Sequence, residues 1–184
     1  ATESVNIPLP AKTEGIPAAQ YVQRMCRIMQ PIPTVVSSDK MPRLNLVTDS
    51  IEKNSLLGGV ATALIVATEF AKKRGIGLRL ITRNAPADPQ DYLNILALNN
   101  LTPPDTVEYY SDYDRDEDGR KATKLSVSSE DIFFATSWWS AKAIEKTSLR
   151  KRFYYIIQEV ETFFYPHGVE HLLCSQVMHD PNID

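Results

Sequence analysis

Carboxylates and aromatic side chains follow one another in the stretch YYIIQEVETFFYPHG, residues 154–168. Its apolar start predicts a buried strand, and Gln158, Glu159 and Glu161 come directly after that strand. Carboxylate oxygens accept hydrogen bonds from sugar hydroxyls, and aromatic faces pack on the C–H surface of a sugar ring. The stretch therefore indicates a saccharide site, while ion pairs with Lys or Arg and core packing of the aromatics would explain the same residues.

Two adjacent glycines, Gly58 and Gly59, stand before a helical repeat in the stretch LLGGVATALI, residues 56–65. Glycine loses more backbone entropy on ordering than other residues, so the pair is costly at the start of a helix. Without side chains, the backbone amides are open to an anion, which the amino end of a helix favours. Contact with a phosphate or carboxylate is one interpretation, and a tight turn with close helix packing is the other.

The elements that must position these residues alternate between strand and helix. Apolar runs predict strands, and helical periodicity and caps predict helices. The strands are 43–47, 78–82, 107–110, 131–136 and 152–158, and the helices are 60–74, 89–98, 138–146 and 168–178. This order predicts an α/β fold with a Rossmann-like parallel sheet flanked by helices, and sites at the carboxyl ends of its strands.

The first 42 residues differ from the rest of the chain. Prolines among polar residues predict an extended lead-in over 1–17, and residues 18–29 have the spacing of a short amphipathic helix. Packing over the core or contact with another subunit fits this helix better than membrane binding, since the helix lacks a strongly basic face. We therefore expect a lead-in over 1–42 and a Rossmann-like domain over 43–184.

Composition excludes several classes of protein. A net charge of −3 provides no basic footprint for nucleic acid. Cys26 and Cys174 are too few for a disulfide framework or a zinc pattern, which favours a reducing, cytoplasmic setting. No run reaches the roughly 18 apolar residues of a membrane span. Peripheral association with a membrane stays open.

Three motifs resemble cofactor or metal sites without meeting their requirements. The sequence GIG at 75–77 follows a helix and precedes a strand, the reverse of a dinucleotide fingerprint. The acidic run DRDEDG at 114–119 matches the first half of a calcium loop, but Leu125 stands where the bidentate Glu belongs. His167, His171 and His179 lack a zinc arrangement, so packing or a substrate hydrogen bond suits His167 better. We expect neither a metal nor a redox cofactor.

Three segments together resemble a known family. These are LNLVTDSIEKNSLLGGVATAL, FFATSWWSA and YYIIQEVETFFYP, in this order and near the family's spacing. They are similar to the amino-terminal half of the WsaF-like glycosyltransferases, bacterial rhamnosyltransferases that build polysaccharides, and the similarity covers about residues 43–180. The family resembles retaining enzymes of GT-B architecture, in which two Rossmann-like domains face each other across a cleft. The amino-terminal domain mainly binds the acceptor, and the carboxyl-terminal domain mainly binds the nucleotide sugar.

The resemblance also implies roles for particular residues. Gly58 and Gly59 would form the loop that faces the donor diphosphate, and Trp138 and Trp139 would follow a sheet strand at the cleft, although paired tryptophans also suit a core. The acceptor-binding candidates are Gln158, Glu159, Glu161, Trp138, Trp139 and His167. Glu159 stands where the family's Gln-Asp-x-Glu stretch has Asp, which keeps the charge and lengthens the reach. No catalytic residue is assigned.

The resemblance predicts an acceptor-side domain of a nucleotide-sugar-dependent rhamnosyltransferase, with dTDP-rhamnose as one candidate donor and a saccharide as acceptor. Retaining enzymes of this kind commonly have two glutamates eight positions apart in the donor domain, and this chain has no such pair. We therefore expect a carboxyl-terminal donor domain to be missing, and this piece alone to be inactive. The alternative is a non-catalytic α/β module that binds a carbohydrate or a protein. A free-standing enzyme ranks third, because no nucleophile and base can be assigned.

Overall fold

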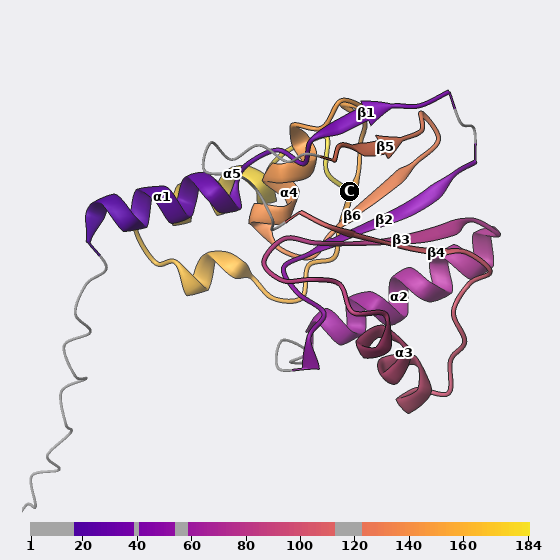
Figure 1. The fold of residues 1–184 in the computed structure, drawn as a ribbon. Helices are drawn as coiled ribbons and strands as arrows, with labels where there is room; N and C mark the ends of the chain where they lie inside the picture. The colour runs from indigo at the N-terminus through magenta and orange to yellow at the C-terminus, as the bar shows by residue number, and fades with distance from the viewer. Residues whose placement is uncertain (1–16, 39–40, 54–58, 113–122) are drawn as a thin grey trace, which may run out of the picture.

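The computed structural model describes residues 17–38, 41–53, 59–112 and 123–184 (Figure 1). Its main sheet has five parallel strands in the order β4-β3-β2-β6-β7. The strands are β2 (Arg43–Thr48), β3 (Gly77–Thr82), β4 (Val107–Ser111), β6 (Ile132–Ala135) and β7 (Tyr154–Tyr155). Counted along the chain, this is the 3-2-1-4-5 order of a Rossmann-like fold, so the predicted fold class is confirmed.

Helices cover both faces of the main sheet (Figure 1). α2 (Gly59–Arg74) and α3 (Pro89–Leu98) lie on one face, while α4 (Trp138–Glu145), α5 (Val169–Met178) and α1 (Ala18–Ile28) gather on the other. Side chains alternate across each strand, so β2 supplies both apolar cores. Leu44 and Leu46 pack toward α2, and Val47 packs toward α4. A strand buried on both faces explains why both Leu46 and Val47, which point to opposite sides, are apolar.

Local signals place several helix ends where we expect them. Asp88 caps α3, since its Oδ1 accepts the Gln90 N–H at 2.8 Å, and Pro89 is the first helical residue. Gly75 ends α2 with a φ of +64°, a conformation that suits glycine. Gly77 is the first residue of β3, one position before the predicted strand over 78–82.

The structure contains a second, two-stranded sheet that the sequence analysis did not predict. β1 (Thr34–Val36) and β5 (Leu125–Val127) pair in parallel. Each strand has three residues, which is too few to show a periodic pattern. The acidic run at 114–119, with its calcium interpretation, lies outside the described residues.

The predicted strand over 152–158 is wrong in length, because only Tyr154 and Tyr155 pair with β6. The end of the chain covers the outer edge of this strand, where the Asp184 carbonyl accepts the Tyr155 N–H at 2.9 Å. Beyond β7 the chain turns into a short 3₁₀ helix, η2 (Glu161–Phe164). The aromatic and β-branched residues of this stretch resemble a strand by composition, and the sheet edge decides where the strand stops.

Within the described residues, no helix combines the length and the apolar character that crossing a bilayer requires.

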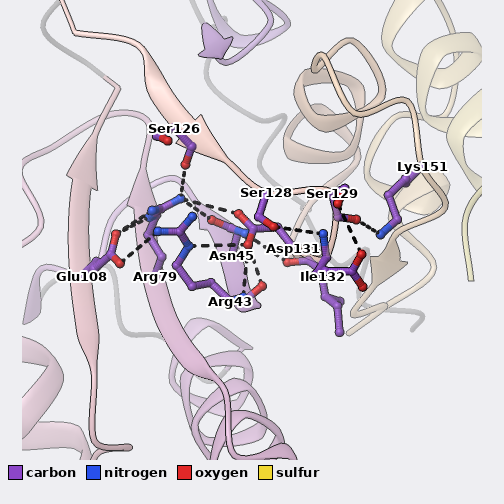
Figure 2. Close-up of polar contacts among 11 residues, drawn as sticks. Arg43, Asn45, Arg79, Glu108, Ser126, Ser128, Ser129, Asp131, Ile132 and Lys151 are labelled. Atoms are coloured by element: carbon purple, nitrogen blue, oxygen red, sulfur yellow. Dashed lines mark hydrogen bonds and ion pairs between the residues drawn. The ribbon is translucent and has the colours of Figure 1, made fainter. Parts of the chain in front are cut away.

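A row of polar side chains crosses the main sheet on the side of α4 (Figure 2). The strand register places Asn45, Arg79 and Glu108 next to one another on β2, β3 and β4. Arg79 donates to Glu108 Oε2 at 2.6 and 2.8 Å, to Asn45 Oδ1 at 3.1 Å and to the Ser126 carbonyl of β5 at 2.9 Å. Arg79 therefore joins the small sheet to the main one.

A second arginine completes this network at the start of β2. The backbone N–H of Arg43 donates to Asp131 Oδ1 at 3.1 Å, and its guanidinium approaches Glu108 at 3.4 Å. The Asp131 side chain is completely buried. Removing one member of such a network leaves a buried charge that has neither a partner nor solvating water. Buried networks are therefore sensitive to single substitutions.

We expect Arg79→Met to lower the free energy of unfolding by about 3 kcal/mol, because it removes the closest cation of Glu108 and one of the two arginines beside the buried Asp131. Urea denaturation followed by circular dichroism measures this change. The matched control is Arg152→Met, which removes an ion pair with Asp184 whose arginine side chain is 64% exposed. That pair should contribute less than about 1 kcal/mol. Equal losses in the two variants would show that the network has no special importance.

Candidate functional site

The carboxyl ends of β2, β3 and β6 bring three loops to one edge of the main sheet. β2 is the switch point of the sheet, because later strands lie first on one side of it and then on the other. Asp49 directly follows β2, Asn84 follows β3, and Trp138 follows β6. In open α/β sheets, ligands bind in the crevice at this place.

A cavity of about 400 Å³ lies at this edge. Its volume falls in the range typical of small-molecule sites. Its lining combines aromatic rings with charged and amide groups: Arg27, Asp49, Asn84, Trp138, Trp139, Tyr165 and Glu170. Such a lining can pack on the apolar face of a sugar ring and exchange hydrogen bonds with its hydroxyls.

Hydrogen bonds between Trp139 and Asp49 join the first turn of α4 to the loop after β2. The indole N–H of Trp139 donates to both carboxylate oxygens of Asp49, at 2.7 and 2.9 Å. The ring also packs edge-to-face on Trp138, with 5.4 Å between ring centroids. Trp139 is half-buried, so one side of its ring stays open to the cavity. The orientation of this ring is therefore set before any ligand arrives.

The amino end of α4 is held by side chains from two directions. Ser137 is its N-cap and forms a reciprocal capping box with Ser140. The backbone N–H of Trp138, in the first turn, donates to Glu161 Oε2 at 3.1 Å. Glu161 thus binds one of the amides that helix geometry leaves unpaired. Its carboxylate positions Trp138, whose side chain is completely buried.

Burial raises the pKa of Glu161 above its ordinary value. The contacts with the Tyr155 hydroxyl and the Trp138 amide oppose this rise, and the negative charge of Asp49 adds to it. Tyr155 is buried beside the same carboxyl group, and its pKa is raised as well, mainly by burial. Glu161 is therefore a half-buried carboxyl group that supports the cavity wall.

Gln158 lies against the amino end of α2. A Cβ atom added to Gly59, the first residue of α2, would collide with the Gln158 side-chain oxygen. The missing side chain at Gly59 therefore lets Gln158 approach the helix start. Two segments singled out in the sequence, the glycine pair and the stretch after β7, thus meet at the same edge of the sheet. Gly58 itself lies outside the described residues.

The remaining candidates do not line the cavity. Glu159 and His167 are both exposed, and neither is among the residues that line the cavity. His171 Nδ1 lies 2.7 Å from the Tyr165 carbonyl, and His179 Nδ1 lies 2.7 Å from the Ser175 carbonyl. In the part of the chain that the structure describes, no group of three or more His, Cys, Asp or Glu side chains is placed to hold a metal ion.

Sequence reasoning singled out the stretch that contains Tyr165 but missed four lining residues: Arg27, Asp49, Asn84 and Glu170. Asp49 and Asn84 could have been found, because each comes within two residues of the end of a predicted strand. Arg27 and Glu170 carry no such signal. Their place depends on how α1 and the residues after β7 pack over the edge of the sheet.

These features define an α/β domain with a Rossmann-like sheet and a polar, aromatic cavity at its switch point. Residues 43–183 match the family described as WsaF, N-terminal domain, and this match spans most of the chain. The chain therefore belongs to the WsaF N-terminal domain family, a glycosyltransferase-related domain, as the resemblance in its sequence predicts. No curated protein matches the chain.

The raised pKa of Glu161 predicts a pH-dependent stability. The folded protein holds this proton more tightly than the unfolded chain, so stability falls as pH rises from the unfolded pKa of about 4.5 through the folded one. In Glu161→Gln the amide oxygen still accepts the Trp138 N–H, and the burial of a charge is removed. We expect this variant to gain stability relative to the wild type as pH rises through that window, in urea titrations at several pH values.

Glu159→Gln is the matched control, since Glu159 is an exposed glutamate two positions away. Its stability difference from the wild type should stay nearly constant with pH. A wild type that becomes more stable than Glu161→Gln as pH rises would contradict the assignment of a raised pKa.

Proposed function

We propose that the chain is the acceptor-side domain of a retaining, nucleotide-sugar-dependent glycosyltransferase. The observation that carries this proposal is the cavity at the switch point, where two indole rings lie beside Asp49 and Glu170. Stacking on Trp139 would orient the sugar ring. The carboxylates would accept hydrogen bonds from its hydroxyl groups. Membership of the glycosyltransferase-related family supports a saccharide over other ligands of this size.

The start of α2 would face the donor. α2 has 16 residues, and its amino end carries the partial positive charge of a helix terminus. Gly59 keeps the backbone there free of a Cβ atom, and Gln158 adds an amide beside it. A diphosphate that leaves the sugar toward this end would be stabilised by the helix and by a second domain.

In this proposal the reaction occurs between two domains. The acceptor hydroxyl oxygen forms a bond to the anomeric carbon while the bond from that carbon to the diphosphate oxygen breaks, and the hydroxyl proton leaves with the nucleoside diphosphate. The part played by this domain is to hold the acceptor hydroxyl beside the anomeric carbon, on the face that the diphosphate leaves, which accelerates the reaction through orientation. Most of the donor site would belong to a carboxyl-terminal domain, so the isolated chain should transfer little sugar.

Exposed apolar side chains near the site offer a surface for such a domain. Phe163 and Phe164 of η2 are 81% and 62% exposed, and Ile157 and Val160 precede them. Patches of this kind often mark contacts between domains. They lie on the stretch that also carries Gln158, next to the start of α2.

The finer parts of the proposal concern the sugar and the setting. We infer a rhamnosyl donor such as dTDP-rhamnose, a role in bacterial polysaccharide synthesis, and a cytoplasmic enzyme with peripheral access to the membrane. No metal is needed, since a helix terminus and basic side chains can stabilise the leaving group. The competing function is a non-catalytic binding module, and a parent gene without a second α/β domain that carries paired glutamates would favour it.

The binding proposal can be tested with the two tryptophans themselves. Trp138 and Trp139 are the only tryptophans in the chain, and both line the cavity, so tryptophan fluorescence reports on this site alone. We expect rhamnose-containing oligosaccharides to change the emission and to give saturation-transfer NMR signals, while dTDP sugars bind weakly or not at all. Trp139→Ala should weaken saccharide binding about tenfold, because a stacking wall is lost.

Phe163→Ala is the matched control, since it removes an exposed aromatic side chain that does not line the cavity. Its saccharide affinity, measured by NMR, should equal that of the wild type. Tight binding of a dTDP sugar to this chain alone would place the donor site in this domain. It would contradict the proposal that this domain binds the acceptor and a second domain binds the donor.

A further inference from the structure

α1 contributes to the cavity although it lies outside the residues that match the family. The match begins at residue 43, and α1 covers Ala18–Ile28. Arg27, in the last turn of α1, is one of the lining residues and is exposed. The cavity therefore has a wall that the family-matched segment does not supply.

Apolar packing attaches α1 to the domain. Met25 is only 5% exposed and belongs to the same core as Trp138. Tyr21 and Met29 pack against this core, and their spacing of four residues places them on the same side of the helix as Met25. α1 therefore packs beside α4 (Figure 1).

Arg83 fastens the carboxyl end of α1 beside the cavity. Its Nη2 donates to the Gln30 carbonyl at 2.9 Å and to the Arg27 carbonyl at 3.5 Å. A cation at this end of a helix interacts favourably with the helix dipole. The backbone N–H of Arg83 donates to the Thr48 and Asp49 carbonyls at 3.0 and 3.1 Å. One residue thus connects α1 to the loop that carries the cavity carboxylate.

We propose that α1 is a wall of the acceptor site and that Arg27 is a specificity-determining residue that binds the hydroxyl oxygens of the saccharide, an inference that rests on the proposed function. A guanidinium donates hydrogen bonds in one plane, which suits the oxygens of neighbouring sugar hydroxyls. Asp49 and Glu170 provide acceptors for the hydroxyl protons. Among the described lining residues, two carboxylates stand against one cation, so a saccharide with a carboxylate or phosphate is disfavoured.

The test compares saccharide affinities of this chain and two variants by NMR titration and tryptophan fluorescence. The probes are a neutral rhamnose trisaccharide and a trisaccharide of equal length that contains a uronic acid. We expect Arg27→Ala to weaken binding of the neutral probe at least about tenfold, as loss of a hydrogen bond from a charged donor does. The contact with Arg83 uses the Arg27 carbonyl, so the substitution leaves it in place.

Lys73→Ala is the control, because Lys73 is an exposed cation in the last turn of α2 that does not line the cavity. The affinity of Lys73→Ala for the neutral probe should equal that of the wild type. Hydrogen exchange provides a second readout, and the amides of α1 should exchange slowly in the wild type and in Arg27→Ala. Fast exchange of the α1 amides in the wild type would contradict the packing of α1 against the domain.

The outcomes separate this inference from the proposed function. If the wild type binds the neutral probe and Arg27→Ala binds it equally well, the role of Arg27 is wrong and the acceptor site stands. If the wild type binds the acidic probe more tightly than the neutral one, the assigned substrate class is wrong. If the wild type binds neither probe, the proposed function fails and the inference fails with it.

Discussion

β2 is hydrogen-bonded to a parallel strand on each side, and the rest of the fold is placed relative to it. Its residues are buried on both faces, so it must lie in the middle of the sheet with a helical layer above and below. Strands β3 and β4 extend one side, and β6 and β7 extend the other. The loops after β2 and β6 therefore diverge at one edge, and the cavity lies between them.

Buried polar groups secure both ends of this arrangement. Toward the amino ends of the strands, Arg79 connects three strands of the main sheet to the small sheet through the Ser126 carbonyl. Toward the carboxyl ends, Asp49 binds the Trp139 indole, and Glu161 binds the amide at the start of α4. A partner left without its bond in these places would be costly, so the strands and the cavity wall have little freedom to shift.

Short-range sequence signals predicted the long elements well. The Asp88 cap and the apolar repeat before Gly75 bound helices that the structure contains. The same signals missed β1 and β5, which are short and pair across a long separation in the sequence. They also extended β7 too far, since composition alone does not show where a strand reaches the edge of its sheet.

By itself, the sequence determined the alternation of strands and helices, the place of the Gly59 segment between a strand and the following helix, and the family, because these depend on periodicity, caps and motif order. Only the tertiary structure decided which side chains share the cavity. Arg27, Trp139 and Glu170 come from segments far apart in the chain and meet because α1, α4 and α5 pack on one face of the sheet. Such a meeting depends on long-range packing, which no local pattern encodes.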